Sequence, residues 1–125
     1  MRLESPAQGT YRVVTEEVEI HGVKLAPGSV LHLRLGAANR DESKFTCPAQ
    51  VDLQRKNPGA HLAFGSGIHH CVGFHLAKRE LYWAFATIAD RFGALRLSAR
   101  HEPIEYLQNY MFRSIKALHV EFELA

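Results

Sequence analysis

The stretch of sequence that most constrains the fold is a glycine-rich segment that leads directly into a helical pattern. The segment reads FGSGIHHCVG, from Phe64 to Gly73, and it holds one of the two cysteines of the chain. Gly65 and Gly67 allow backbone angles that other residues rarely adopt, so we expect a tight turn there. Cys71 lies where the helix should begin, and the free N–H groups and dipole of a helical start favour a thiolate.

From Val72 to Phe92 the pattern becomes helical. Apolar and alanine residues recur at three- and four-residue steps, which predicts one long helix: they are Leu76, Trp83, Ala84, Ile88 and Phe92. Gly93 follows at the position where glycine commonly ends a helix. At the other end, Gly73 has no side chain, so a flat and bulky group could approach the first helical turn.

The N-terminal part of the chain predicts a β-meander. Its β-rich runs are Tyr11–Thr15, Val18–Ile20 and Val30–Leu35. Turn signals at His21–Gly22 and Pro27–Gly28 separate these runs.

The rest of the chain alternates between irregular and β-rich sequence. A polar, irregular loop is expected over 39–59, and two further strands over 94–98 and 118–124. A β-meander, a loop, a helix and closing strands together indicate the α+β class. We expect one domain over 1–125, made of a β-region and meander at 1–60, a cysteine loop and helix at 61–93, and strands at 94–125.

Composition excludes several classes of protein. The formal net charge is +2, which gives no basis for binding nucleic acid. No apolar run approaches the ~18 residues that span a bilayer, and the first residues lack the apolar core of a signal peptide. With only Cys47 and Cys71, the chain is not a disulfide scaffold. We therefore expect a cytoplasmic protein that binds neither nucleic acid nor membrane.

The segment around Cys71 resembles the heme-binding loop of bacterial cytochrome P450 enzymes. The family signature has Phe, a small residue and Gly before the cysteine, and an apolar residue and Gly after it, as FGSGIHHCVG does. The flanking HLAFG and HLAKRE are similar to bacterial members as well. The resemblance implies that Cys71 is the metal ligand, the axial thiolate of the iron of heme b.

The resemblance implies further cofactor-binding residues. His69 would donate to a heme propionate, and Phe64 would pack beside the sulfur of Cys71. Gly65 and Gly73 would shape the loop so that heme can approach it.

The resemblance extends over the β-region, which ends in the family-like segment ANRD. It implies Arg12 as a second propionate partner, since a guanidinium pairs well with a carboxylate. The alternative for Arg12 is a surface arginine on a strand.

The resemblance covers only the C-terminal part of a P450 fold, so 1–125 is expected to be a single C-terminal P450-like fragment. An intact relative would be a monooxygenase that oxidises a small apolar substrate with electrons from a ferredoxin-like redox partner. The distal helix with its proton-delivering acid–alcohol pair is missing from the match, so no catalytic residue is assigned.

The family's structural triad is also incomplete. Arg2 matches the arginine of the Glu-x-x-Arg motif, but its glutamate has no match, and Gln50 stands where the family has a meander arginine. An arginine without ion-pair partners loses its reason to be buried.

Two hypotheses about function stay open. In the first, the chain binds heme through Cys71 and has residual oxidoreductase chemistry at most. In the second, it is a cofactor-free, non-catalytic remnant that folds by self-association. Under either hypothesis the helix would present an apolar patch, which predicts a homo-oligomer through that face, with exchanged elements, or else a rearranged fold.

A different metal is a further alternative for the same loop. His69, His70, Cys71 and His75 lie close together in sequence, and His61 could be a fourth zinc ligand, although the spacing matches no common zinc motif. A disulfide between Cys47 and Cys71 would require a rearranged fold and would block heme ligation.

Overall fold

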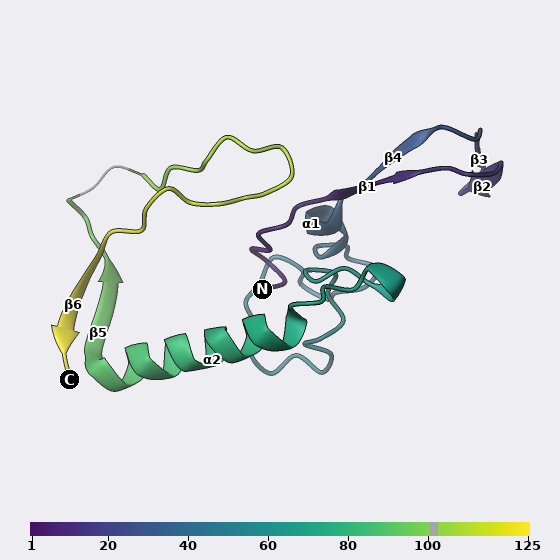
Figure 1. Ribbon diagram of the computed structural model, residues 1–125. Helices are drawn as coiled ribbons and strands as arrows, with labels where there is room; N and C mark the ends of the chain where they lie inside the picture. The colour runs from purple at the N-terminus through teal and green to yellow at the C-terminus, as the bar shows by residue number, and fades with distance from the viewer. Residues whose placement is uncertain (101–102) are drawn as a thin grey trace. The chain divides into compact units, whose positions relative to one another are not determined.

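A computed structural model describes residues 1–100 and 103–125 and confirms a mixed α+β composition (Figure 1). The chain divides into two compact units. Unit 1 comprises residues 1–63 and 109–113, and unit 2 comprises residues 64–108 and 114–125.

Unit 1 is built on two antiparallel strand pairs. β1 (Thr10–Val13) pairs with β4 (Val30–Leu33), and β2 (Val18–Ile20) pairs with β3 (Val23–Leu25). The three predicted strands are therefore confirmed, with small shifts at their ends. The last predicted strand, Val30–Leu35, ends at Leu33, two residues earlier than expected. The short helix α1 (Leu35–Ala38) follows it and was not predicted.

The turns in unit 1 lie where the sequence places them. His21 and Gly22 have φ of 48° and 79°, and Gly28 has φ of 86°. These left-handed angles suit glycine and are tolerated by few other residues. The turn at His21 and Gly22 folds β2 directly back onto β3. The strand β3 was not predicted because its three residues are too few to form a clear alternating pattern.

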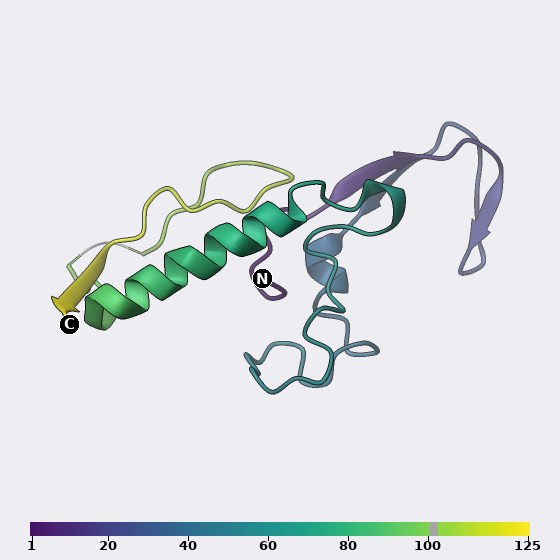
Figure 2. The same ribbon diagram turned by 60° about the horizontal axis from the view of Figure 1, so that its bottom comes forward.

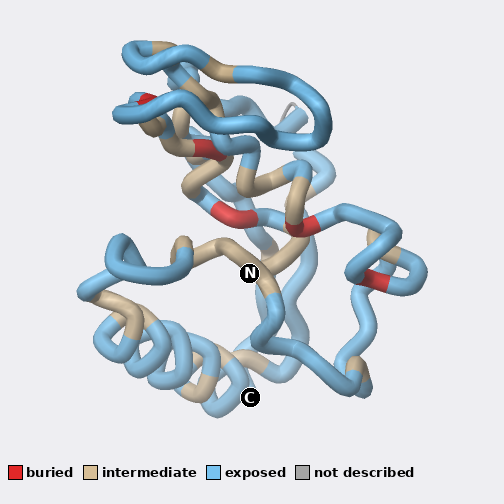
Figure 3. The backbone as a smooth tube through the Cα atoms, turned by 90° about the vertical axis from the view of Figure 1, so that its right-hand side faces the viewer, coloured by how far each residue is buried: buried red, intermediate tan, exposed pale blue. Residues whose placement is uncertain are grey.

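The core of unit 1 is small and partly polar (Figure 3). Its buried side chains are Ser5, Val14, Asn39 and Phe45. The Asn39 Oδ1 accepts a hydrogen bond of 2.6 Å from the Leu62 N–H. This bond ties the end of the long irregular segment to its beginning, which accounts for a loop that keeps a defined path without strands or helices of its own.

Arg2 fixes the same segment at three further points. Its Nη1 donates to the carbonyl oxygens of Asn39 and Pro48 at 2.7 Å each, and its Nη2 donates to the Gln50 carbonyl at 3.2 Å. Its guanidinium carbon lies 4.8 Å from the centroid of the Phe45 ring. The expectation was that Arg2 loses its reason to be buried without ion-pair partners. Arg2 is nevertheless half-buried, because backbone carbonyls accept from its planar set of donors.

Unit 2 contains the cysteine loop, one long helix and a closing hairpin (Figures 1 and 2). The helix α2 spans Phe74–Arg91, which confirms the helix expected over 72–92. It continues directly into β5 (Phe92–Leu97), and β5 pairs antiparallel with β6 (Val120–Leu124). Both predicted C-terminal strands are confirmed.

The end of α2 differs from the prediction. Gly93 does not end the helix with a left-handed residue, because Phe92 is already extended, with φ −118° and ψ 120°. The ring of Phe92 packs against that of Phe122 with 4.7 Å between centroids, and Phe92 pairs with Leu124 in the hairpin. Strand pairing, rather than a glycine cap, therefore decides where the helix stops.

The Arg2 fork yields a stability prediction. Arg2→Met keeps the length of the side chain but leaves the carbonyls of Asn39 and Pro48 without their donor, so we expect unit 1 to lose about 1–3 kcal/mol. Urea unfolding followed by hydrogen exchange of unit 1 peptides measures this loss. Arg34→Met, at an exposed arginine, is the matched control. Equal stability of the two variants would show that the fork contributes nothing.

His61 predicts how the stability of unit 1 depends on pH. Its pKa lies below the ordinary 6.5, first because partial burial disfavours the imidazolium, and then because the amino terminus and Arg2 are positive. Its Nδ1 accepts from the Ala63 N–H at 3.2 Å, a bond that protonation of Nδ1 removes. The unfolded chain therefore binds a proton more readily than the folded unit, and His61 destabilises the fold as pH falls below about 6.5.

The measurement compares the urea midpoints of the parent protein and His61→Gln between about pH 7.5 and about pH 5. We expect the parent to lose stability relative to the variant as the pH falls. Parallel pH profiles would contradict this role for His61.

Candidate functional site

The loop from Phe64 to Gly73 is closed by one backbone hydrogen bond. The Cys71 N–H donates to the Phe64 carbonyl at 2.8 Å. Gly65 and Gly67 have φ of 71° and 65°, as the tight turn requires. The bond fixes the position of the cysteine backbone in the loop. The two glycines allow the chain to turn tightly enough for the bond to form.

Cys71 is an exposed, free thiol just before α2. The Phe74 N–H, in the first residue of the helix, donates to the Cys71 carbonyl at 3.2 Å. A Cβ added at Gly73 would lie 3.8 Å from the Cys71 Sγ, which is an ordinary contact. The loop itself therefore does not require glycine at this position, and the glycine leaves open space next to the sulfur.

Aromatic side chains brace the loop against the start of α2. The rings of Phe64 and Phe74 meet edge to face with 4.9 Å between centroids. The His70 ring lies 5.0 Å from the Phe74 ring, also edge to face. Such pairs contribute about 0.5–1.5 kcal/mol each beyond the area they bury. This packing positions the loop relative to the helix.

Two apolar residues next to the thiol were not singled out from the sequence. Ile68 and Val72 are 98% and 102% exposed, respectively. Exposed apolar side chains that gather on one surface can mark a place that another group covers. The available signal was their apolar character, three residues before and one after the cysteine, in an otherwise polar loop.

A cysteine sulfur with exposed aliphatic residues near it in the same loop suits heme. The soft sulfur is a ligand for heme iron, and the aliphatic side chains of Ile68 and Val72 can cover an apolar macrocycle. The donor set and its surroundings thus fit the group that the resemblance implies.

The predicted site residues fall into both units. The structure brings Phe64, Gly65, His69, Cys71 and Gly73 together in one loop of unit 2, where the exposed His69 ends the short 3₁₀ turn Gly67–His69.

Arg12 is half-buried on β1 of unit 1. Its Nη1 donates to the Tyr11 carbonyl at 2.7 Å and to the Thr10 Oγ1 at 3.3 Å. Its role beside the loop of unit 2 stays a prediction.

Comparison with known proteins matches the chain over most of its length. The family described as "Cytochrome P450" matches residues 1–119. The chain belongs to the cytochrome P450 family. The resemblance seen at Cys71 is thereby confirmed.

Bacterial cytochromes P450 are among the similar proteins. A biotin biosynthesis cytochrome P450 of Bacillus subtilis is 41% identical over 98% of this chain and 30% of the relative. A putative cytochrome P450 133B1 of Xylella fastidiosa is 39% identical over 97% of this chain and 30% of the relative. The chain thus spans about a third or less of the length of these relatives.

Solved P450 structures contain the same fold. P450BioI, solved with an acyl carrier protein that bears hexadec-9Z-enoic acid, gives a TM-score of 0.91 at 42% identity, over 98% of this chain and 31% of that one. Substrate-free CYP150A6 of Mycobacterium marinum gives 0.93 at 31% identity, over 99% and 32%. The chain therefore has a partial P450 fold, as predicted.

The zinc alternative for this P450 loop is not supported. Within residues 1–100 and 103–125, no group of three or more His, Cys, Asp or Glu side chains could hold a metal ion. The alternative that His69, His70, Cys71 and His75 form a zinc site is therefore wrong, and His61 lies in the other unit. Cys47 and Cys71 are both free, so no disulfide joins them. None of the helices in the described part of the chain is long and apolar enough to cross a membrane.

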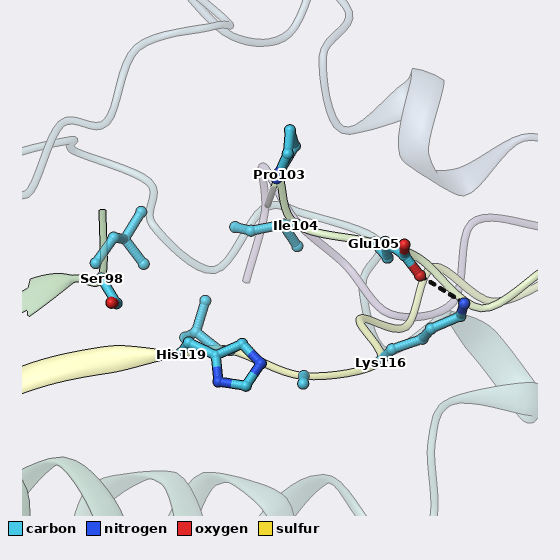
Figure 4. A pocket seen from close by; sticks show the side chains of 9 residues that line it. Ser98, Pro103, Ile104, Glu105, Lys116 and His119 are labelled. Atoms are coloured by element: carbon cyan, nitrogen blue, oxygen red, sulfur yellow. Dashed lines mark hydrogen bonds and ion pairs between the residues drawn. The ribbon is translucent and has the colours of Figure 1, made fainter. Parts of the chain in front are cut away.

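A hollow of about 550 Å³ lies elsewhere in unit 2 (Figure 4). Its charged groups are already paired, since the Lys116 Nζ lies 2.6 Å from the Glu105 Oε2. The hydroxyl of Ser98, also in its lining, donates to Glu121 at 3.1 Å. None of the lining residues comes from the Phe64–Gly73 loop. The hollow is therefore separate from the loop that holds Cys71.

The loop glycines give a prediction that needs no ligand. Gly65→Ala places a Cβ 3.3 Å from the His69 carbonyl oxygen at a left-handed φ, so we expect a loss of about 1–2 kcal/mol from the loop. Gly59→Ala, with no left-handed φ and nothing within 4 Å of the added Cβ, is the control. Hydrogen exchange around Cys71 should increase in Gly65→Ala alone. Unchanged exchange would show that the loop does not depend on this angle.

Proposed function

We propose that this chain carries the heme-thiolate centre of a P450 monooxygenase, with Cys71 as the axial ligand. The observation that supports this most directly is the exposed, free thiol of Cys71 in a loop closed onto Phe64 and bordered by the exposed Ile68 and Val72. Heme held through a thiolate supplies redox chemistry that activates dioxygen.

The residues of the loop have distinct roles in this proposal. Cys71 binds the iron, and the bond to Phe64 keeps its backbone from turning away. Gly73 has no side chain beside the sulfur, and a bound macrocycle would need that space. Ile68 and Val72 exclude water from the thiolate, which would otherwise be hydrated and a weaker ligand.

Charge pairing orients the cofactor in the same proposal. His69 would donate to a propionate, and a guanidinium such as that of Arg12 can pair with a carboxylate through two parallel donors. Arg12 has donors beyond the Nη1 that contacts its own strand.

Oxidation of a substrate requires more than these residues. The resemblance implies that proton delivery and most of the substrate pocket come from other parts of the family's fold, and this chain spans about 30% of the relatives' length. In this proposal the chain supplies the proximal side, and by itself it does not catalyse monooxygenation. In this proposal the complete protein acts on a small apolar substrate and receives electrons from a ferredoxin-like donor.

A second candidate is a cofactor-free remnant that self-associates. The exposed apolar residues of α2 favour it, because a helix of this kind needs a covering surface. The two candidates differ in whether the purified chain takes up heme.

Titration with heme tests the proposal. We expect a Soret band typical of a thiolate-ligated heme, which shifts with carbon monoxide after reduction. Cys71→Ala should lose the band, because the only iron ligand is removed, whereas Cys47→Ala, at the other exposed thiol, should keep it. A parent protein that stays colourless under these conditions would overturn the proposal.

Gly73→Ala separates loss of the fold from loss of the site within the same titration. The added Cβ makes only an ordinary contact in the protein, so the far-UV circular dichroism should not change. Heme affinity should fall, because the methyl group occupies the space beside the sulfur. Arg12→Ala and His69→Ala should weaken binding without changing the thiolate spectrum.

A further inference from the structure

Three aromatic rings from distant parts of the chain meet in unit 1. Tyr11 on β1 lies directly opposite His32 on β4, and their rings stack with 4.5 Å between centroids and 22° between planes. The ring of Tyr110 lies 5.6 Å from that of His32, at an angle of 30°. The side chains of Tyr11 and Tyr110 also hydrogen-bond to one another. We call Tyr11, His32 and Tyr110 the aromatic cluster.

The segment 109–113 carries the third ring and is fastened to N-terminal residues of the same unit. The Gln8 N–H donates to the Met111 carbonyl at 2.8 Å. The Arg113 N–H donates to the Pro6 carbonyl at 2.7 Å. The third ring therefore approaches β1 from a backbone that is itself held in place.

Gly9 leaves the space for the middle ring. A side chain at this position would clash with the His32 Nε2, so the glycine lets the imidazole lie close to the chain that enters β1. His32 is half-buried, whereas Tyr11 and Tyr110 are 38% and 75% exposed, respectively. The fold thus holds two phenols close to each other while both stay accessible to small molecules in solution.

Tyr11 stays a neutral phenol at physiological pH. Its pKa is raised above the ordinary 10.0, first because partial burial removes water from the phenol and then because Tyr110 lies beside it. Oxidation of Tyr11 must therefore remove a proton together with an electron.

Two neighbouring phenols can be joined by oxidation. Each phenol loses one electron and its hydroxyl proton, which leaves a phenoxyl radical, and the two radicals combine through the ring carbons next to the oxygens. Each of these carbons then loses its hydrogen as a proton, and each oxygen takes one up. The pair has then lost two electrons and two protons and gained one carbon–carbon bond. Hydrogen peroxide takes up the same two electrons and two protons and becomes two molecules of water.

Proximity decides which tyrosines couple. Tyr11 and Tyr110 are already in contact, so their radicals combine within one molecule without a diffusional encounter. Tyr82 is 62% exposed, but the aromatic ring next to it is that of Trp83, with 5.3 Å between centroids. A bond between Tyr11 and Tyr110 is therefore the product that the fold favours.

We propose that Tyr11 and Tyr110 form an oxidative modification site, at which hydrogen peroxide and a heme peroxidase join the two phenols as dityrosine. The bond ties β1 to the segment 109–113. It closes the chain between residues 11 and 110, which restricts the unfolded state and so stabilises the fold. The modification is separate from heme binding at Cys71 and does not depend on it.

Mild oxidation of the purified full chain tests the proposal. The chain is treated at low concentration with a heme peroxidase and limiting hydrogen peroxide. We expect dityrosine fluorescence from a product that migrates as one chain and is lighter than the parent by two hydrogen atoms. Tandem mass spectrometry of its peptides should place the bond between Tyr11 and Tyr110.

Variants with phenylalanine in place of one tyrosine identify the phenols that react. Tyr11→Phe and Tyr110→Phe should each lose the intramolecular product, because phenylalanine keeps the ring but has no hydroxyl to oxidise. Tyr82→Phe removes an exposed phenol outside the aromatic cluster and should form as much product as the parent. Unchanged hydrogen exchange in β1 and β4 before oxidation shows that each variant keeps the fold.

The oxidised protein provides a second measurement. Its urea midpoint should lie above that of the untreated protein, and Tyr110→Phe should show no such rise after the same treatment. Equal midpoints for the oxidised and untreated parent would contradict the stabilising role of the bond.

Two results would overturn the modification site. One is the absence of an intramolecular product under conditions in which the same peroxidase couples free tyrosine. The other is a product that maps to Tyr82 or Tyr106, or that persists in Tyr110→Phe. Failure of heme uptake at Cys71 is a separate result, because the peroxidase brings its own heme.

Discussion

The proposed function depends on one contact, the hydrogen bond from the Cys71 N–H to the Phe64 carbonyl. It closes a loop whose two left-handed glycines have no side chains to hold it in place. With that bond made, the thiol, Ile68 and Val72 all reach solvent beside the start of α2. In unit 1 a few hydrogen bonds likewise order a long segment that has no strands or helices. They come from the guanidinium of Arg2 and the side-chain amide of Asn39.

The sequence predicted the cysteine loop and α2 well because both depend on local rules. Glycine at left-handed positions and apolar residues at helical steps are visible without knowledge of the rest of the fold. The end of α2 was not predicted correctly, since the pairing of Phe92 with Leu124 and its packing on Phe122 are contacts across the hairpin. The three residues of β3 were missed for the opposite reason, because they are too few to show a pattern.

Side-chain partners were harder to predict than elements. Arg2 was expected to need carboxylate partners. It donates instead to the backbone carbonyls of Asn39, Pro48 and Gln50, which the fold brings near it. The histidines near Cys71 were weighed as metal ligands because they lie close together in sequence, but proximity in a loop does not make side chains converge. The exposure of Ile68 and Val72 could only come from the structure, although their apolar character was visible.

The direct passage from α2 into β5 leaves no loop between the helix that begins near the thiol and the strand pair at its other end. The helix has 18 residues, so it is about 27 Å long at 1.5 Å per residue. Because no loop separates Arg91 from Phe92, the direction of the helix at the cysteine loop and the direction in which β5 leaves its far end are set by one continuous segment of backbone.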